Sequence, residues 1–269
     1  MCFVNREIML IDINSNVGHW PFQQTNCNSC ESLLERMNRY DVDISVVSNM
    51  NGIFYKDSHA ANEELHSELQ SDERFKDRFI PFAILNPTFA GWKRDLEICA
   101  KRFTVKGIRL YPQYHDYEVT DPACFELVRS ARDMGLVVAF TIRMVDSRCR
   151  SWLDIPEEWS LRDFMPVLKE VPDAKYFFLN IANGMNLNDE ERSFFCERDV
   201  LFDTSGRNIS DPGMLMKNFG KERFAFGTHS PILDYLTGLL RVESLRENEA
   251  DKPVRELLRS GNAERMLGL

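Results

Sequence analysis

Short apolar runs alternate with longer amphipathic segments from one end of the chain to the other. Runs rich in β-branched and aromatic residues predict eight strands, several of them apolar throughout, as strands buried on both faces are. These predicted strands span residues 8–13, 44–48, 79–84, 105–110, 137–143, 175–181, 200–203 and 223–227. The segments between them predict helices at 31–40, 63–71, 92–101, 124–134 and 161–169, and a short closing helix at 262–269.

Strict alternation of strands and helices predicts an α/β fold of the (β/α)8 TIM-barrel type, built as a single domain over residues 1–269. The chain has 269 residues, close to the roughly 250 that one such barrel needs. An open, doubly wound sheet is the alternative. The most irregular stretch, residues 145–160, carries Pro156 with Trp152 and Trp159, and we expect either a lid or interface there or a surface excursion without function.

Charge and hydropathy exclude several classes of partner. The formal net charge is −9, and the acidic residues are spread along the chain, which argues against nucleic acid and anionic membrane as partners. We find no basic region followed by a long apolar core, and no apolar run approaches the roughly 20 residues that span a bilayer. We therefore expect a cytoplasmic protein whose partner is a small molecule, with a homodimer left open.

The seven cysteines show no framework spacing. Cys27 and Cys30 form a C-x-x-C pair, and no second pair supplies the other half of a zinc site. We interpret them as reduced thiols near the start of a helix, with a redox role as the alternative.

Polar residues gather where the predicted strands end, which is where an α/β barrel carries its reacting groups. The first strand leads into Asp12, Asn14 and Asn16, which strand alternation gives a shared orientation toward the barrel mouth. Polar residues also follow the later strands, at 109–117, 141–143, 180–183, 203–207 and 227–230. These positions define the predicted functional site.

Five segments in this order carry a family resemblance: 12–22 (DINSNVGHWPF), 107–112 (GIRLYP), 201–206 (LFDTSG), 226–231 (FGTHSP) and 261–268 (GNAERMLG). Together they resemble the amidohydrolase-related family of metal-dependent TIM-barrel hydrolases, whose branch also includes decarboxylases. The resemblance spans nearly the whole chain, and it implies a barrel with its site at the carboxyl ends of the strands.

The sequence departs from this family at the positions of its metal ligands. Asn14 and Asn16 stand where the family has an H-x-H pair, and His229 stands where it has an aspartate that acts as ligand and base. Where histidine ligands are expected at the ends of the fifth and sixth strands, the sequence offers Thr141, Ile142 and Arg143 on the fifth, and Asn180 and Asn183 on the sixth. Amide oxygens are weak ligands for zinc, and an arginine repels a cation. We therefore predict no metal ligands and no cofactor, with a weakly bound zinc ion as the alternative.

We predict His229 or His115 as the general base, and Arg109, with Arg143 and Arg207 as alternatives, as the group that stabilises an oxyanion. The predicted substrate-binding residues are Asn14, Asn16, His19, Trp20, Tyr111, Arg143, Asn180, Asp203 and Arg207. Each also has a structural interpretation, such as capping a strand end or shaping a loop.

The resemblance and the arginines together predict a hydrolase that acts on a small, polar, carboxylated substrate, an ester, lactone or amide, without requiring a metal. One alternative is a barrel that has lost catalysis and binds a metabolite or another chain. Another is a decarboxylase or other lyase on the same barrel. The fold alone does not choose among them.

Overall fold

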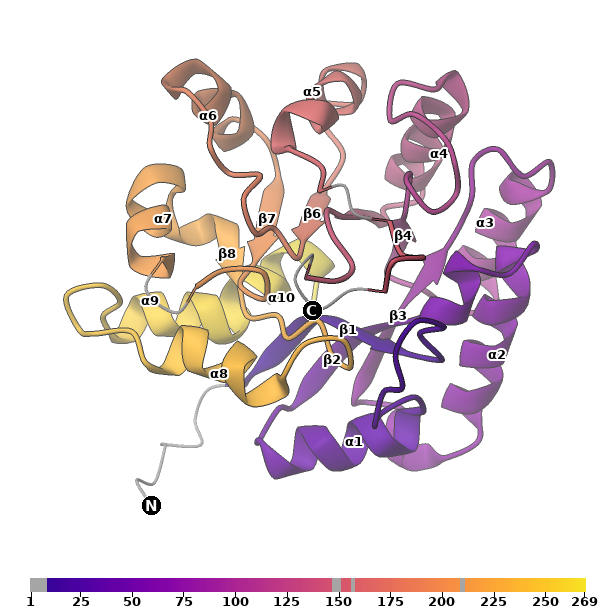
Figure 1. Cartoon of the computed structure of the whole chain (residues 1–269), viewed down its shortest axis with the longest axis horizontal. Helices are drawn as coiled ribbons and strands as arrows, with labels where there is room; N and C mark the ends of the chain where they lie inside the picture. Colours follow the sequence, from indigo (N-terminus) through magenta and orange to yellow (C-terminus); the bar gives the residue numbers. More distant parts are fainter. Residues whose placement is uncertain (1–8, 147–150, 156–157, 209–210) are drawn as a thin grey trace.

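Eight parallel strands follow one another around a ring in chain order, each hydrogen-bonded to the next (Figure 1). The computed structural model describes residues 9–146, 151–155, 158–208 and 211–269. The strands are β1 (Ile11–Val17), β2 (Ile44–Asn49), β3 (Phe79–Ile84), β4 (Gly107–Leu110), β5 (Val137–Thr141), β6 (Tyr176–Leu179), β7 (Val200–Asp203) and β8 (Phe224–Ala225). Backbone hydrogen bonds from Ile13 N–H to Phe226 O (3.0 Å) and from Asn16 N–H to Ser230 O (2.7 Å) join the first strand to the last. The predicted TIM barrel is confirmed, and the open sheet is excluded.

Helices cover the outside of the ring (Figure 1). They are α1 (Cys30–Arg39), α2 (Ser58–Gln70), α3 (Trp92–Lys101), α4 (Pro122–Asp133), α5 (Leu161–Glu170), α6 (Asp189–Cys196), α7 (Pro212–Phe219), α8 (Tyr235–Glu243), α9 (Lys252–Glu256) and α10 (Asn262–Leu267). The main deviation from the predicted helices is α2, which begins at Ser58 rather than at residue 63. The Asp57 side chain accepts the His59 N–H and caps this earlier start.

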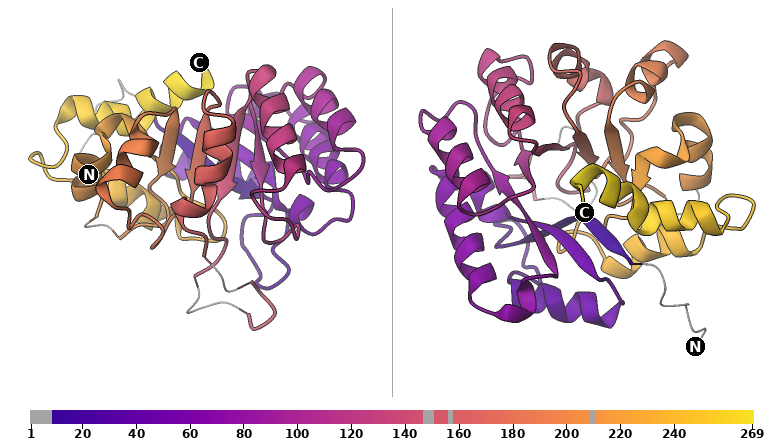
Figure 2. Two further views of the ribbon diagram at one scale, coloured as in Figure 1. Left: turned by 90° about the horizontal axis from the view of Figure 1, so that it is seen from above. Right: turned by 180° about the vertical axis from the view of Figure 1, so that it is seen from behind.

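The closing helix α10 lies across one end of the barrel (Figure 2). Its residues Ala263, Met266 and Leu267 pack with the apolar side chains inside the ring. This helix therefore seals the end at which the strands begin, and the open mouth is at their carboxyl ends.

The first strand differs from its prediction. We expected it at residues 8–13, whereas β1 continues to Val17 and all seven of its residues are buried; Ile8 lies outside the described residues. The polar positions fit inside a strand because their side chains find partners, as when Ser15 Oγ donates to Val46 O at 2.9 Å. Asn14 and Asn16 of the predicted site are thus part of the barrel wall and do not belong to a loop after it.

Strand alternation divides the barrel interior into two layers. The lower layer is apolar and includes Ile13, Val137, Ala139 and Leu201. One alternate position further along the strands, Arg109, Thr141 and Asp203 form the upper layer, and all three are buried. In β1 the pairing register shifts between Asp12 and Ser15. Because Ile11 and Ile13 face inward, this shift separates Asp12 from Asn14 and Asn16, so the predicted shared orientation is wrong for Asp12.

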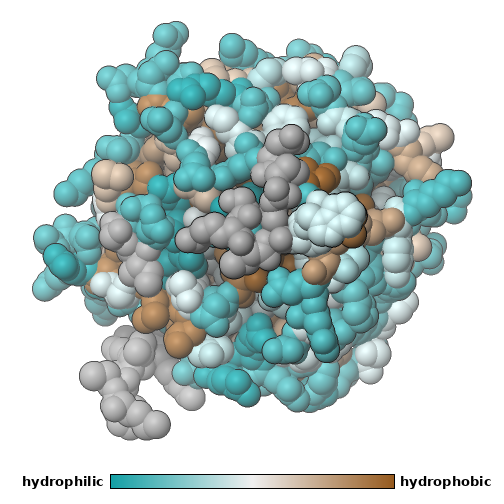
Figure 3. Space-filling view, viewed as in Figure 1, coloured by the Kyte–Doolittle hydropathy of each residue, from teal (hydrophilic) through white to brown (hydrophobic). Residues whose placement is uncertain are grey.

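The outer surface agrees with the spread of charge along the chain. The face seen in Figure 3 is mostly hydrophilic, with small scattered apolar patches. Within the described ranges, no helix has the length and apolar character required to cross a bilayer. In the segment 145–160, Trp152 is 86% exposed, while Trp159 packs on Phe164; residues 147–150 and 156–157, which include Pro156, lie outside the described residues.

Candidate functional site

Asp203, at the end of β7, is the centre of a buried hydrogen-bond network. Its Oδ2 accepts from Asn14 Nδ2 (2.7 Å) and Ser205 Oγ (2.5 Å), and its Oδ1 accepts the Asn180 N–H (2.7 Å). Burial raises the pKa of this carboxyl group, and the hydrogen bonds from Ser205 and Asn14 oppose that shift. Gly227 allows β8 to approach, since a Cβ atom there would lie 2.6 Å from Asp203 Oδ2. The carboxylate is therefore fully engaged within the barrel.

His229 follows β8 and is completely buried. Its Nε2 lies 2.8 Å from Met144 O, an acceptor, so Nε2 carries the proton. Nδ1 then accepts from Asn14 Nδ2 at 3.1 Å. Burial lowers the pKa of His229 to about 3, and the charges of Arg109 and Arg143 lower it further. A neutral ring with both nitrogens engaged is a poor general base, so this geometry favours a positioning role over the predicted one.

Asp12 joins β1 to the segment after β8. Its Oδ1 accepts the backbone N–H groups of Asn14 (2.9 Å) and Thr228 (3.0 Å), and its Oδ2 accepts from Thr228 Oγ1 (2.6 Å). Burial raises the pKa of Asp12 to about 6, despite these hydrogen bonds. Asp12 therefore helps to close the barrel.

Arg109, on β4, is completely buried and has few partners. Its Nη1 donates to Asn16 Oδ1 at 2.7 Å and lies 3.3 Å from Ser15 O. In the described part of the chain, its Nε and Nη2 have no hydrogen-bond partner, and no carboxylate forms an ion pair with it. A buried guanidinium without a counter-charge is costly, so this group requires an explanation.

More polar atoms without partners lie on the same side of the mouth. Among the described residues, these include Tyr111 OH, Thr141 Oγ1 and Asn180 Oδ1, in or directly after β4, β5 and β6, and Trp20 Nε1. Asn180 adopts a left-handed backbone conformation (φ 54°), which is uncommon for a residue other than glycine and recurs at functional sites. The sequence placed Thr141 at the end of the fifth strand but gave it no role, although its alternate position above Ala139 was a usable signal.

His115 lies in the loop after β4, next to the Tyr111 ring. Its Nε2 donates to Gly52 O at 3.2 Å, which leaves the Nδ1 lone pair without a partner in the region that the structure describes. Burial lowers the pKa of His115, so the ring is neutral at neutral pH. Unlike His229, this histidine keeps a nitrogen that can accept a proton.

The remaining predicted residues lie in different surroundings. His19 is exposed, and its Nε2 contacts Asn28 Nδ2 at 2.9 Å. Trp20 is buried in an aromatic cluster with Phe22, Phe54 and Tyr114. Arg143 is half-buried; its backbone carbonyl accepts from Asn180 Nδ2 (2.7 Å). Arg207 donates to Ala182 O and, at 3.0 Å, to Asp211 Oδ2. The structure thus places Arg207 in contacts that hold neighbouring loops.

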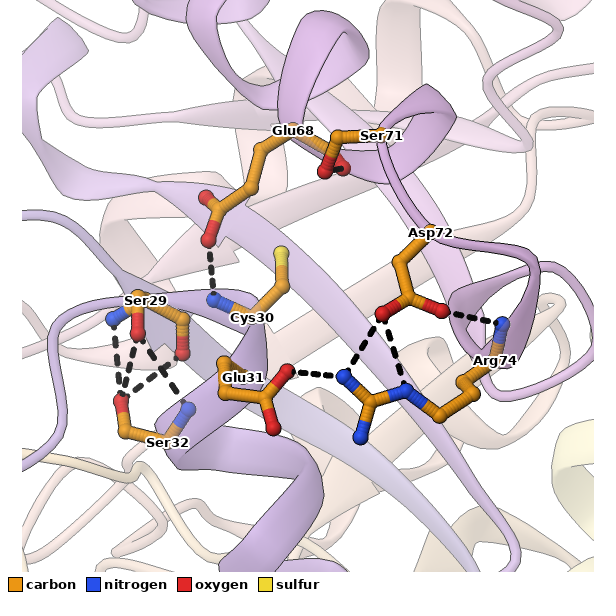
Figure 4. Close-up of polar contacts among 8 residues, drawn as sticks. All are labelled: Ser29, Cys30, Glu31, Ser32, Glu68, Ser71, Asp72 and Arg74. Atoms are coloured by element: carbon orange, nitrogen blue, oxygen red, sulfur yellow. Dashed lines mark hydrogen bonds and ion pairs between the residues drawn. The ribbon is translucent and has the colours of Figure 1, made fainter.

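The C-x-x-C pair lies on the outside of the barrel. The Cys30 N–H donates to Glu68 Oε1 at 2.6 Å, and Arg74 bridges Glu31 and Asp72 nearby (Figure 4). Burial raises the pKa of both Cys27 and Cys30, which keeps them as thiols. They pack at the start of α1, as predicted.

In the described residues, the acidic and histidine side chains at the mouth are not arranged as a metal site. Over the described ranges, no group of three or more His, Cys, Asp or Glu side chains is arranged to hold a metal ion. The side chains that converge there are amides, hydroxyl groups, a histidine, a guanidinium and the fully hydrogen-bonded Asp203 carboxylate.

Comparison with known proteins identifies the fold. No family model and no curated sequence matches the chain. A Staphylococcus aureus protein provisionally described as an amidohydrolase is similar in structure, with a TM-score of 0.72, 16% identity, and coverage of 97% of this chain and 100% of that one. So is a dihydroxybenzoic acid decarboxylase from a Polaromonas species with bound manganese and the inhibitor 2-nitroresorcinol (TM-score 0.73, 12% identity, coverage 97% and 97%). A 5-carboxyvanillate decarboxylase from Sphingomonas paucimobilis is also similar in structure, with a TM-score of 0.72, 13% identity, and coverage of 98% of this chain and 100% of that one. The chain has the fold of the amidohydrolase-related TIM-barrel enzymes.

Proposed function

We propose that this chain belongs to the amidohydrolase-related family and hydrolyses a small, polar ester or lactone at the mouth of its barrel. The observation that supports this function best is the set of buried polar atoms without partners on β4, β5 and β6 and the loop after β4. A folded chain satisfies most of its buried polar groups, and a group of exceptions at the carboxyl ends of three adjacent barrel strands fits a ligand site.

In the proposed reaction, His115 and Arg109 have distinct roles. The Gly52 carbonyl fixes the His115 tautomer, so that Nδ1 can take a proton from an attacking water molecule. The positive charge of Arg109 stabilises, through space, the oxyanion that forms on the substrate carbonyl, while its Nε and Nη2 edge stays available for a substrate carboxylate. His229 and Asp203 position the wall of the site through Asn14.

Decarboxylation of a small aromatic acid is the second candidate. Structural relatives at 12% and 13% identity are decarboxylases of this kind, and the barrel is shared. Likeness of fold is weaker support than the geometry of the site, so we rank this function second.

A turnover screen tests both candidates. Purified protein is assayed against small esters, lactones and aromatic acids, with acid release and CO2 release measured separately. We expect hydrolysis by the wild type, and a loss of kcat of about 10²-fold or more in His115→Gln. The acid limb of the pH profile should lie below pH 6.5, because the pKa of His115 is lowered.

His66→Gln is the matched control, since this histidine stacks on Phe103 on the outer wall and should leave turnover unchanged. CO2 release from an aromatic acid without ester or lactone hydrolysis would replace the first candidate with the second. The absence of any turnover would refute both.

A further inference from the structure

The two Arg109 nitrogens without partners belong to the same edge of the guanidinium plane. In arginine, the Nε–H bond and one N–H bond of Nη2 point in the same direction and form the two-pronged edge that pairs with a carboxylate. The third nitrogen, Nη1, is held by Asn16 Oδ1 at 2.7 Å. Arg109 is therefore fixed on one side and unpaired on its bidentate side.

The residues around this guanidinium do not fit a divalent cation of the kind bound in the Polaromonas decarboxylase. Asn16 Oδ1 accepts from Arg109, and Asn14 directs its amide nitrogen toward Asp203 and His229. The His229 nitrogens are both engaged. A cation at this place would be repelled by the guanidinium, and the nearby His229 imidazole and Asp203 carboxylate already have hydrogen-bond partners.

A second positive charge belongs to the same side of the mouth. Arg143 lies two residues after the end of β5, the strand paired with β4, and its Nε is buried without a partner among the described residues. Two guanidinium groups with unused donors produce a positive potential that attracts anions. Neutral donors next to them, Tyr111 and Thr141, suit an anion equally well.

We infer that Arg109 takes the place of a metal ion in this barrel and binds the carboxylate of a small ligand directly on its Nε and Nη2 edge. This inference rests on the proposed function only because both place the ligand at the barrel mouth. Binding of a carboxylate to Arg109 can be measured whether or not the protein turns a substrate over. A planar monoanion matches both the shape and the charge of this edge, whereas a divalent cation matches neither.

Anion-dependent stability tests the inference. The melting temperature is measured after exhaustive dialysis, with sodium acetate, benzoate or nitrate added against equal concentrations of sodium chloride. We expect the planar anions to raise the melting temperature of the wild type with the logarithm of their concentration. In Arg109→Met the affinity should fall by at least about 30-fold, as expected when a buried charge pair loses one partner.

Two further measurements distinguish a specific loss of anion binding from a general effect of removing an arginine or from misfolding. Arg223→Met removes an arginine at the opposite end of the barrel, whose Nη1 donates to Arg198 O at 2.7 Å, and it should keep the anion response. If Arg109→Met does not fold, an arginine Nε–H NMR signal of the wild type should shift on adding acetate and be missing in Arg109→Lys.

Metal analysis tests whether the protein binds a metal ion, which the inference excludes at this site. Elemental mass spectrometry of protein purified without added metal should find far less than one equivalent, and added zinc or manganese should not raise the melting temperature. One equivalent of bound metal, or an equal response to chloride and acetate, would overturn the inference. Turnover that persists in Arg109→Met would overturn the inference that Arg109 binds the ligand, while leaving the proposed hydrolysis intact. Anion binding without any turnover would uphold the inference and refute the proposed hydrolysis.

Discussion

The two sides of the barrel mouth differ in how completely their polar groups are paired. On the side of β1, β7 and β8, each carboxylate oxygen of Asp12 and Asp203 has at least one donor. On the side of β4, β5 and β6, Arg109, Tyr111 and Thr141 are equally buried but keep unpaired atoms within the described structure. These side chains are similarly buried, so pairing distinguishes the two sets, although Arg207 Nε after β7 also has no partner among the described residues.

This difference indicates two roles for buried polar groups, one in stabilising the fold and one in binding a ligand. A satisfied network fixes the register of strands distant in sequence, here β1 against β7 and β8. An unsatisfied group carries a desolvation cost that a ligand can relieve. Substitutions on the paired side should therefore change stability, and those on the unpaired side should change ligand binding.

The largest expected effect is the pH dependence of the free energy of unfolding that His229, on the paired side, causes. Its lowered pKa of about 3 means that the folded state excludes a proton that the unfolded state accepts near pH 6.5. The stability is thus complete above pH 6.5 and is lost as the pH falls toward 3, by about 5 kcal/mol in total.

Urea unfolding of the wild type and of His229→Gln between pH 7 and 4 measures the contribution of His229 as the difference between their free energies of unfolding. The variant keeps a donor for Met144 O but does not titrate. By pH 4 the wild type should have lost roughly 3 kcal/mol more than the variant. Parallel curves would show that His229 accepts protons freely and would weaken the distinction between the two sides.

The next effect is the loss of the Asp203 carboxylate. Asp203→Ala leaves the Asn14 amide and the Asn180 N–H without their acceptor inside the barrel, so we expect about 4 kcal/mol of destabilisation. Asp203→Asn retains an acceptor and should cost less than half as much. Asp133→Ala, on the exposed end of α4, is the control and should stay within about 0.5 kcal/mol. Equal costs in all three variants would contradict the role of the network.

Asp12 should act with the opposite sign to His229. Its pKa is raised to about 6, so the folded state holds a proton that the unfolded state releases near pH 4. The stability that this proton provides is present below pH 4 and is lost as the pH rises to 6, by about 3 kcal/mol. Asp12→Asn should remove this slope in the same urea experiment. Because the two groups oppose each other between pH 4 and 6, a nearly flat wild-type curve in that range is expected.

The sequence predicted the fold from periodicity, and it located the site because barrel chemistry follows the strand ends. β3, β7 and α3 begin and end at the predicted residues, since their apolar patterns are uninterrupted. The end of β1 was misplaced because Asn14 and Asn16 have the polarity of a loop; their partners, Asp203 and Arg109, lie 189 and 93 residues away. Such pairing has no local signal. The same limit explains why His229 and His115 looked alike in sequence although only His115 keeps an unpaired nitrogen.

The smallest expected effect compares two buried tyrosines. Tyr111 and Tyr176 are 1% and 0% exposed, but only the Tyr176 hydroxyl group has a protein partner in the described structure, Val171 O at 2.7 Å. Tyr176→Phe should therefore cost about 1 kcal/mol, the usual net value of a hydrogen bond. Tyr111→Phe removes an unpaired hydroxyl group, so the free energy of unfolding should stay unchanged or rise slightly in dialysed protein. If Tyr111→Phe costs as much as Tyr176→Phe, its hydroxyl group is paired in solution, and the unpaired side of the mouth is already satisfied without a ligand.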